Sequence, residues 1–355
     1  MPKVAIIGGG ITGLTAAYLL KKKGVGVSLH DAQDRPGGVI RTTRREGFLA
    51  EHGPNSILLT SPLIMELVGD LGLGNRVTAP GDVAKNRFIV RGRRPLRLPL
   101  SPGTFLTTPL FSLRAKLRLL REPFIGRSPA DAEESLGDFV RRRIGREFLE
   151  YAINPFVAGV YAGDPEMLSV RHSFPKLHAL EQKYGSLIRG QIFGAKERKK
   201  RPEAGKNEAG MISFDEGLQV LTDALAGQIG PGLKLGQGVA SMRRAAGGWE
   251  IVPEGGTAIP GFGAVLYAGS AHALSSMAVG NGGSADLSVL SEIHYPPVTS
   301  LVLGFRRELV GHPLDGFGVL IPEVEPFAIL GVLFSSSLFP GRAPEGFVTL
   351  TCFLG

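Results

Sequence analysis

The sequence is poor in cysteine and has no long apolar run. Cys352 is the one cysteine among 355 residues, so an internal disulfide and a cysteine-based metal site are both excluded. This usage favours a reducing compartment. No run reaches the roughly 18 apolar residues that a membrane-spanning helix needs. The opening run of residues 1–7 continues directly into glycines without a cleavage site, which predicts a strand and not a signal peptide.

Residue patterns typical of hydrolases and zinc enzymes are also missing. The seven histidines are scattered, without an HExxH motif or a His–His pair at helical spacing. No Ser, His and Asp order stands out. We therefore expect no metal site and no side chain in the role of catalytic acid, base or nucleophile.

Negative charge is missing from one long segment. The chain carries a net charge of +8, yet residues 83–121 contain ten basic residues and no acidic one, so the rest sums to −2. With 43% hydrophobic and 20% charged residues, the composition is that of a globular protein. At about 100–200 residues per domain, the length predicts two or three domains. Because the excess of positive charge is confined to this segment, we expect the segment itself to contact a partner.

The first elements predict a dinucleotide-binding unit. A strand over Lys3–Ile7 precedes Gly8-Gly9-Gly10-Ile11-Thr12-Gly13, a G-x-G-x-x-G motif. A helix over Leu14–Lys23 follows, with Gly24 beyond its end, and then a strand over Val25–His30. In such a unit Gly8 permits the turn, Gly10 lets the backbone approach a pyrophosphate, and Gly13 lets the helix pack on the strand. The helix N-terminus attracts the phosphates.

An acidic residue follows the second strand at the position expected for ribose binding. Asp31 lies 18 residues past Gly13, which favours an unphosphorylated ribose, as in NAD or FAD, over NADP. Two additional segments are not needed for NAD: DRPGGVIRT (34–42) and EHGPNS (51–56). The combination resembles the FAD-dependent amine-oxidase superfamily, and with it FAD as cofactor.

The middle of the chain is basic and amphipathic. Residues 114–121 place three leucines among four cations, after the acid-free, apolar stretch 102–113. This pattern suits an anionic membrane surface. A solvated basic face is the alternative, and a nucleic-acid site is weaker because no binding motif or stacking aromatics accompany the cations.

The remaining elements are read from periodicity and composition. We expect helices over 135–152, from Phe214 to about Leu225 and, after a segment over 261–268, over 271–278. We expect strands over Leu233–Arg243 and Trp249–Val252 and from Gly280 onward, a structured loop over 154–175, and an exposed linker over Lys196–Arg201.

Four longer segments resemble the oxygen-dependent protoporphyrinogen oxidases of haem biosynthesis, within that superfamily. They are KNRFIVRGRRPLRLP (85–99), NPFVAGVYAGDPEMLSV (154–170), GFGVLIP (316–322) and LGVLFSSSLFPGRAP (330–344). They keep the family's order over nearly the whole chain. The match is closest to plant-like and related bacterial members.

The resemblance implies an α/β fold with three parts. A Rossmann-like FAD-binding domain of the amine-oxidase type would comprise residues 1–82 and 206–275, a helical and membrane-associating domain would be inserted at 83–205, and a mixed-sheet substrate domain would cover 276–355. It also implies the cofactor-binding residues: Gly8, Gly9, Gly10, Ile11, Thr12, Gly13, Asp31, Ala32, Arg35, Gly38, Val39, Gly53, Pro54, Asn55, Ser56 and Val239.

The implied substrate is a porphyrinogen, an apolar macrocycle with propionate tails. Arg87 matches the family arginine that faces a propionate, and Gly159 matches a position at the pocket wall. Phe317, Leu320 and Leu330 match positions that sandwich the pyrrole rings. The alternatives are a surface salt bridge for Arg87 and ordinary core packing for the three apolar residues.

The implied reaction is oxidation of CH–CH groups of protoporphyrinogen IX by O2, giving protoporphyrin IX and H2O2. FAD accepts hydride from a methylene bridge, and pyrrole protons leave to solvent, so no side-chain base is demanded. A cytoplasmic location, peripheral on the inner face of the cell membrane, a homodimer and hand-off to a ferrochelatase-like enzyme complete the expectation.

Three other readings stay open. Coproporphyrinogen III, with four propionates, would need more cations in the pocket. A related FAD-dependent amine oxidase or desaturase would share the FAD motifs but not GVYAGDP and GFGVLIP. A membrane-associated binding module would hold flavin without turnover. The family sequence continues beyond Phe353–Gly355, so we expect a C-terminally truncated fragment and must test whether it retains FAD.

Overall fold

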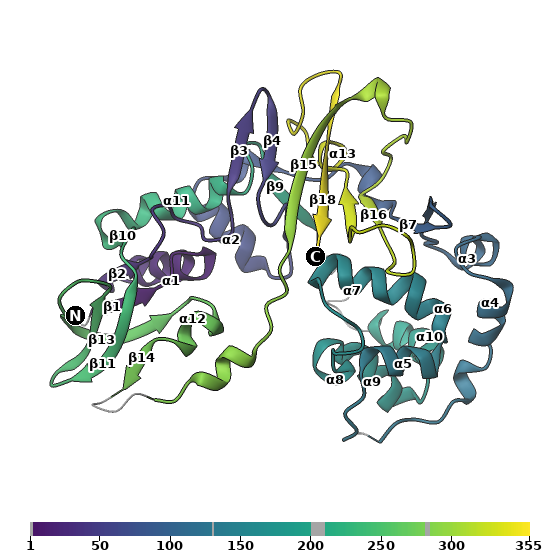
Figure 1. Ribbon diagram of the computed structural model, residues 1–355, viewed down its shortest axis with the longest axis horizontal. Coiled ribbons are helices and arrows are strands. Elements are labelled where there is room, and N and C mark those ends of the chain that lie inside the picture. The colour runs from purple at the N-terminus through teal and green to yellow at the C-terminus, as the bar shows by residue number, and fades with distance from the viewer. Residues whose placement is uncertain (1–2, 130, 200–209, 281–284) are drawn as a thin grey trace. The chain divides into compact units, whose positions relative to one another are not determined.

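The computed structural model describes residues 3–129, 131–199, 210–280 and 285–355, which form two compact units (Figure 1). Unit 1 comprises Met1–Thr78 and Ile212–Tyr295, and unit 2 comprises Ala79–Met211 and Pro296–Gly355. Both units are therefore assembled from two separate segments of the chain.

Unit 1 is built on a seven-stranded mixed sheet with the order β10-β2-β1-β13-β12-β11-β14. Strands β10, β2, β1 and β13 are parallel, β12 runs antiparallel to both β13 and β11, and β14 is parallel to β11. The strands are β1 (Lys3–Ile7), β2 (Val27–His30), β10 (Leu233–Lys234), β11 (Val239–Ala245), β12 (Gly248–Pro253), β13 (Ile259–Tyr267) and β14 (Ala278–Gly280).

Alternate residues of β1 enter two different apolar clusters, as the period of a strand requires. Ile6 packs with the buried faces of α1 (Ile11–Lys22) and α11 (Gln219–Ile229), which lie side by side over the sheet in Figure 1. Ala5 and Ile7 pack on the other side with buried side chains of β11, β12 and β13. The strand is thus buried on both sides, as its apolar sequence predicts.

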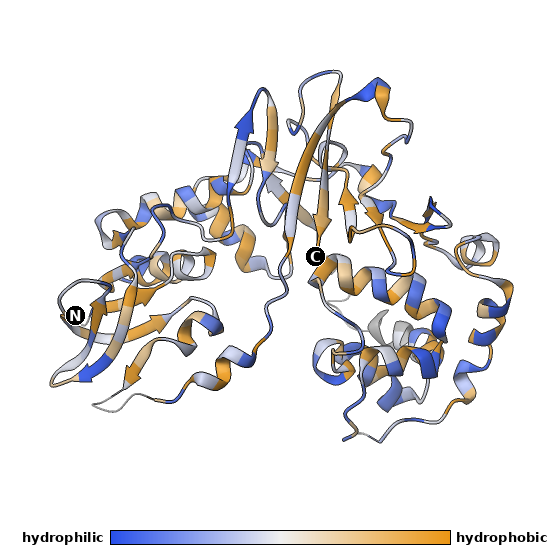
Figure 2. Cartoon of the chain, viewed as in Figure 1, coloured by the Kyte–Doolittle hydropathy of each residue, from blue (hydrophilic) through white to orange (hydrophobic). Residues whose placement is uncertain are grey.

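The other elements of unit 1 are short. A hairpin of β3 (Thr42–Arg45) and β4 (Phe48–Glu51) has a hydrophilic tip, which is blue in Figure 2. The remaining elements are a three-stranded sheet of β5 (Ile57–Leu58), β9 (Met211–Phe214) and β6 (Val77–Thr78), two helices, α2 (Pro62–Asp70) and α12 (Ala271–Ser275), and 3-10 turns at Gly74–Arg76, Gly230–Gly232 and Ser288–Glu292.

Unit 2 combines a six-stranded sheet with most of the helices. The sheet order is β15-β18-β17-β16-β7-β8, antiparallel except where β16 and β7 pair in parallel. The strands are β7 (Phe88–Arg91), β8 (Arg94–Arg97), β15 (Thr299–Arg306), β16 (Gly318–Leu320), β17 (Gly331–Leu333) and β18 (Phe347–Leu354). The helices are α3 (Pro102–Thr107), α4 (Leu113–Leu119), α5 (Leu136–Arg143), α6 (Arg146–Phe148), α7 (Asn154–Tyr161), α8 (Val170–Ser173), α9 (Pro175–Tyr184), α10 (Leu187–Lys199) and α13 (Ser335–Leu338), with 3-10 turns at Asp82–Lys85, Glu122–Phe124 and Arg307–Leu309.

Strand β7 joins the sheet to the helices. Phe88 packs with Phe334 and Val348 of the sheet side, whereas its neighbour Ile89 packs with Phe111 and Phe148 of the helical side. The helical domain expected at 83–205 and the sheet expected at 276–355 therefore share strands and lie in one compact unit.

Several expected elements differ from the structure because glycine and proline act locally. The helix expected over 135–152 is interrupted at Gly145, whose φ is +101°, and then contains a π-helical turn at Leu149–Ile153. The strand expected over Leu233–Arg243 is broken at Gly236. The loop expected over 154–175 is wrong, because α7 and α8 occupy part of it. Pro155 is tolerated in the first turn of α7, where its missing N–H costs no helical bond.

Other differences are shifts of boundaries. Helix α1 begins at Ile11 and not at Leu14, and β2 begins two residues later than expected. Phe214 ends β9, and α11 begins at Gln219. Of the linker expected at Lys196–Arg201, residues 196–199 continue α10 and the rest lies outside the described residues.

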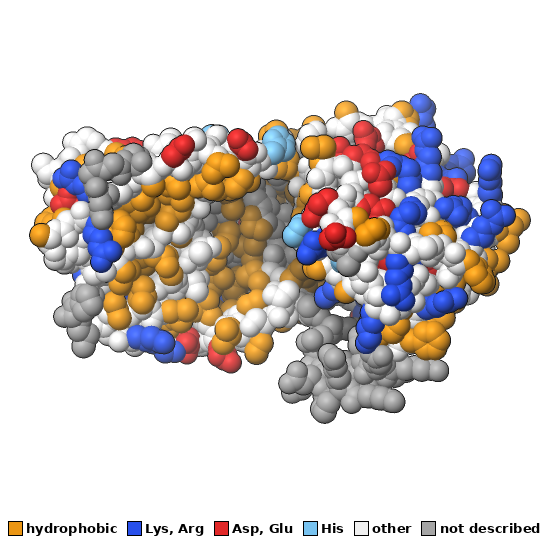
Figure 3. Space-filling view, turned by 90° about the horizontal axis from the view of Figure 1, so that it is seen from below, with side chains coloured by type: hydrophobic (Ala, Val, Ile, Leu, Met, Phe, Trp, Pro, Cys, Tyr) orange, Lys and Arg blue, Asp and Glu red, His pale blue; other side chains and the backbone are white. Residues whose placement is uncertain are grey.

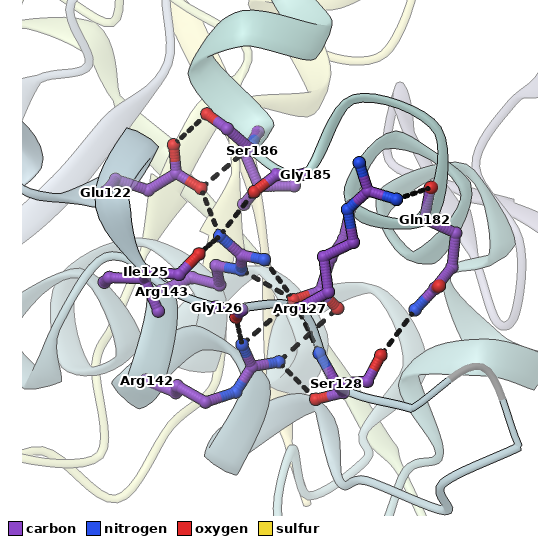
Figure 4. A network of polar contacts seen from close by, with 12 residues as sticks. Glu122, Ile125, Gly126, Arg127, Ser128, Arg142, Arg143, Gln182, Gly185 and Ser186 are labelled. Carbon is purple, nitrogen blue, oxygen red and sulfur yellow. Dashed lines mark hydrogen bonds and ion pairs between the residues drawn. The ribbon is translucent and has the colours of Figure 1, made fainter.

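A buried ionic network holds the helices of unit 2 together (Figure 4). Arg143 of α5 is fully buried and pairs with Glu181 of α9 and with Glu122. Glu122 accepts hydrogen bonds from Ser186 Oγ at 2.5 Å and from the N–H of Leu187 at 2.8 Å, which satisfies the N-terminus of α10. Three helical segments therefore meet at one guanidinium.

Removal of this guanidinium should destabilise the protein. An Arg143→Met substitution leaves Glu122 and Glu181 buried without it, which we expect to cost about 3–5 kcal/mol of unfolding free energy. Arg146→Met is the matched control, because Arg146 is 81% exposed beside Glu150 and such a pair contributes about 0–1 kcal/mol. Urea unfolding followed by circular dichroism measures both. Equal unfolding midpoints for the two variants would contradict the prediction.

The same network gives stability a dependence on pH. Burial opposes ionisation of Glu181, but hydrogen bonds from Arg142 and Arg143 outweigh it and lower the pKa of Glu181 below its ordinary value. A lowered pKa in the folded state stabilises the protein above the unfolded pKa, and this contribution disappears as the pH falls through the folded pKa.

Candidate functional site

The glycine-rich turn after β1 is closely packed. Gly8 has φ of +108°, and a Cβ there would lie 2.9 Å from the carbonyl carbon of Ala268, which follows β13. A Cβ on Gly13 would overlap the carbonyl oxygen of Gly8. The turn therefore fits between strand and helix only because both positions lack a side chain.

Gly10 differs from its neighbours because space lies beside it. A Cβ at Gly10 would meet no described atom within 4 Å. Gly10 is also the N-cap of α1, and it has no side chain to accept the N–H groups of the first turn formed with Ile11, Thr12 and Gly13. A helix N-terminus without a side-chain cap and with open space in front of it is suited to a phosphate.

The carboxylate of Asp31 is fixed next to this turn. It accepts hydrogen bonds from the N–H of Gly9 and, at 2.7 Å, from the N–H of Gln33. Asp31 is half-buried and Ala32 is exposed. A carboxylate held at the end of the second strand can accept the hydroxyl groups of a ribose, as its sequence position predicts.

The loop after Asp31 returns to the glycine turn. The N–H of Gly37 donates to the carbonyl of Gly9 at 2.8 Å, and a Cβ on Gly38 would lie 3.1 Å from the Cα of Gly10. Arg35 holds this loop, since its guanidinium donates to the carbonyl oxygens of Gly38 at 2.6 Å and Ile40 at 3.0 Å. The second glycine pair therefore lies against the first.

The remaining expected cofactor residues lie in two other segments, residues 53–56 and the start of β11. Gly53 packs against the carbonyl of Val39, a residue whose side chain is 78% exposed. Asn55 donates to the carbonyl of Gly53, and Pro54 and Ser56 lie in the same segment before β5. Val239 is buried at the start of β11. All sixteen expected cofactor residues lie in unit 1, and their roles toward FAD remain predictions.

The residues expected at the substrate wall lie in unit 2, where three of them meet. A Cβ on Gly159 of α7 would overlap Leu320 Cδ2 and lie 3.9 Å from the carbonyl oxygen of Leu330. Leu320 ends β16 and Leu330 precedes β17, and the side chains of both are half-buried. These residues thus form one apolar wall at which a larger side chain on α7 would not fit.

Arg87 and Phe317 form a second pair. The guanidinium carbon of Arg87 lies 5.3 Å from the centre of the Phe317 ring. Arg87 is exposed, and within residues 3–129, 131–199, 210–280 and 285–355 no carboxylate pairs with it. An exposed guanidinium without a salt bridge remains available to a carboxylate.

Sequence reasoning missed some residues that hold the cofactor region together. Glu51 is buried and accepts from Thr42 Oγ1 at 2.7 Å and from the N–H of Leu218 at 2.8 Å, which ties the β3–β4 hairpin to the start of α11. Gln237 bonds to the backbone of Asp31. Gly236 and Gly238, inside a presumed strand, were the signal for a turn at Gln237.

Neither a metal-ion cluster nor a membrane-spanning helix is present in the described segments. Three or more His, Cys, Asp or Glu residues arranged to hold a metal ion do not occur there. Of the helices in these segments, none combines the length and apolar character needed to cross a membrane.

The chain is similar to porphyrinogen oxidases over almost its whole length. It is 36% identical to protoporphyrinogen oxidase 2, chloroplastic/mitochondrial, of Arabidopsis thaliana, covering 99% of this chain and 75% of that protein. It is 30% identical to coproporphyrinogen III oxidase of Bacillus subtilis, covering 99% and 77%.

Solved structures share the fold. A structure from Exiguobacterium sp. 255-15 matches with a TM-score of 0.79 at 23% identity, covering 99% of this chain and 77% of that one. Putrescine oxidase matches with a TM-score of 0.70 at 16% identity, covering 100% and 75%. The α/β fold with a Rossmann-like sheet in unit 1 and a mixed sheet in unit 2 is therefore confirmed.

The space beside Gly10 gives a selective test of the phosphate position. A Gly10→Val substitution should leave the fold intact, because its φ of −70° suits any residue and no described atom lies within 4 Å of the added Cβ. The new side chain would occupy the place of the pyrophosphate, so we expect loss of flavin absorbance after incubation with FAD and desalting, with an unchanged melting temperature. Gly69→Val in α2, also open, is the control. Flavin retained by Gly10→Val at the wild-type level would refute this placement.

The family assignment agrees with the glycine turn, the ribose carboxylate and the second glycine pair. Residues 11–355 match the family described as flavin containing amine oxidoreductase, which implies FAD as the cofactor. The chain belongs to the flavin containing amine oxidoreductase family.

Proposed function

We propose that this chain oxidises protoporphyrinogen IX to protoporphyrin IX, with FAD as cofactor, O2 as electron acceptor and H2O2 as product. One observation carries the proposal. The relatives at 33–36% identity from Arabidopsis thaliana, Nicotiana tabacum and Oryza sativa are protoporphyrinogen oxidases, and each match covers 99% of this chain.

Three cations close to Arg87 in the sequence are paired with carboxylates, whereas Arg93 and Arg94 of the β7–β8 hairpin are exposed. Arg91 pairs with Glu147, Arg97 pairs with Asp315 and Lys85 pairs with Asp82. Paired guanidinium and ammonium groups are less available to a propionate. Arg87 therefore remains available to a propionate, and turnover of both porphyrinogens decides between a substrate with two propionates and one with four.

Each unit would contribute a different part of the mechanism. FAD, when bound, supplies the two-electron oxidation and is restored by O2. In unit 1 the first turn of α1 would bind the pyrophosphate and Asp31 would accept hydrogen bonds from the ribose hydroxyls. In unit 2 Leu320, Leu330 and Phe317 would hold the pyrrole rings and exclude water, while Arg87 would orient a propionate through a bidentate contact.

The function is tested by turnover of both porphyrinogens by the 355-residue chain loaded with FAD. We expect faster oxidation of protoporphyrinogen IX than of coproporphyrinogen III, with consumption of O2 and release of H2O2. The Arg87→Ala variant should raise KM for protoporphyrinogen roughly tenfold or more, since a charged hydrogen bond contributes about 1.5–3 kcal/mol. Arg94→Ala, an exposed arginine of the same hairpin, should leave KM unchanged.

The outcomes separate the remaining readings. Preference for coproporphyrinogen III would replace the substrate with the one acted on by the Bacillus subtilis relative. An unaltered KM in Arg87→Ala would remove Arg87 from the site. Bound flavin without turnover of either porphyrinogen would contradict the proposed oxidase activity and favour a module that binds flavin without catalysis.

We further propose that helices α3 and α4 contact an anionic membrane surface. Leu113, Leu117 and Leu120 recur at helical spacing and are 72%, 54% and 68% exposed, and Phe124 is 83% exposed. Figure 3 shows hydrophobic and basic side chains intermingled on the surface of unit 2. Exposed apolar side chains next to cations are typical of an interfacial helix.

The structure identifies which cations of this segment are available. Arg118 donates to the carbonyl of Arg142 at 3.0 Å, and Lys116 donates to the carbonyl of Thr108 at 2.7 Å. Arg114 and Arg121 have no such bond among the described residues.

The double variant Arg114→Glu with Arg121→Glu should therefore lose binding to anionic vesicles and keep FAD binding. Each cation contributes about 1 kcal/mol near such a surface. Lys23→Glu with Arg244→Glu, two exposed residues of unit 1, makes the same charge change and should bind vesicles as the wild type does. Equal vesicle binding by both double variants in a sedimentation assay would overturn this location.

A further inference from the structure

We propose that His30 and Gln237 are positioning residues that set the adenosine end of the FAD site, acting through Asp31 and Val239. The inference rests on the proposed cofactor residues of unit 1 and adds two residues that contribute no group to the glycine turn. Neither is part of a motif in the sequence.

His30 is a buried ring with a hydrogen-bond partner on each nitrogen. It ends β2 directly before Asp31 and is only 2% exposed. Nε2 lies 2.9 Å from Ser28 Oγ, and Nδ1 lies 2.8 Å from Gln237 Oε1. Both polar ends of a buried imidazole are therefore satisfied within the protein.

These partners assign the state of the ring. The amide oxygen of Gln237 can only accept, so Nδ1 carries the hydrogen and donates it. Nε2 of the neutral ring then accepts the hydroxyl hydrogen of Ser28. Burial lowers the pKa of His30, which outweighs the opposite effect of the bond to Gln237 and keeps the ring neutral at pH 7.

Gln237 holds β2 at two successive residues. Its side chain accepts from His30, and its backbone N–H donates to the carbonyl of Asp31 at 2.7 Å. The same turn is fastened by the N–H of Gly236, which donates to the carbonyl of Gln33 at 2.8 Å, and by the N–H of Asp31, which donates to the carbonyl of Lys234 at 3.0 Å. The turn between β10 and β11 is thus bound to the segment that carries the ribose carboxylate.

This arrangement links the two proposed contacts of the adenosine. Asp31 is placed by Gly9 and Gln33 from one side and by Gln237 from the other. Val239, a position that the family resemblance places with its backbone at the adenine, follows Gln237 after a single residue, Gly238. A side-chain bond that fixes Gln237 therefore fixes the spacing between ribose acid and adenine segment. A cavity of about 540 Å³ beside Ala32 is lined by this turn.

The test measures the affinity of the full apo-chain for ADP and for FAD by titration calorimetry, with thermal melts of each variant. Gln237→Leu removes the acceptor and leaves the buried Nδ1–H unpaired, and His30→Leu removes the donor. We expect both to raise the Kd for ADP and FAD about tenfold. His30→Asn, which offers an amide N–H close to the position of Nδ1, should restore the Kd to within roughly twofold.

Two controls separate positioning from stability and from the location of the cofactor. Ser213→Ala changes a buried residue of β9 outside the cofactor residues and should alter only the melting temperature. Asp31→Ala should weaken ADP binding if the proposed ribose contact is correct. Because Gln237 is half-buried in a turn, we expect Gln237→Leu to fold. The Kd of that variant then tests the proposal even if His30→Leu does not fold.

The results have distinct meanings. If the leucine variants have lower melting temperatures but bind ADP with the wild-type Kd, the positioning role is overturned. The proposed ribose contact of Asp31 is not affected by that result. Failure of His30→Asn to rescue binding in a folded protein would also overturn it. If Asp31→Ala binds ADP normally, the ribose contact itself is wrong and the inference falls with it.

Discussion

Close approach of backbone to backbone in the turn after β1 is the constraint on which unit 1 depends. Gly13 packs on the carbonyl of Gly8, and Gly8 packs on Ala268 at the end of β13. These contacts bring the N-terminus of α1, which has no side-chain cap, to the end of the parallel strands, with open space beside Gly10. Asp31 and the loop at Gly37 and Gly38 then attach to the same turn by hydrogen bonds.

A similar absence of a side chain shapes unit 2. Gly159 lets α7 approach Leu320 and the backbone of Leu330, so a helix contacts the end of the sheet directly. The position of α7 is in turn secured by the apolar cluster around Phe139 and Val157, whereas the ionic network of Arg143 joins α5 to α9 and to Glu122. Burial of charge in this network is tolerable because every oxygen and nitrogen of the ion pairs has partners.

The sequence could predict those parts of the molecule that depend on neighbours along the chain. The strand before Gly8, the turn, Asp31 and the Gly24 end of α1 all follow from local patterns, and the structure confirms these elements. Helix α7 was missed because its Pro155 and Gly159 are typical of loops, although packing overrides that preference. Partners such as Gln237 for His30 could not be predicted, since no pattern links positions so far apart.

The pairing of β1 has a consequence for how the chain acquires its structure. Ile7 pairs with His30 on one side and with Tyr267 on the other, so the first strand gains its second neighbour only after most of the chain has been synthesised. Until then one edge of β1, with its unpaired N–H and C=O groups, is open to other strands. Such distant pairing slows folding, and it leaves this edge open to pairing with other chains while synthesis is incomplete.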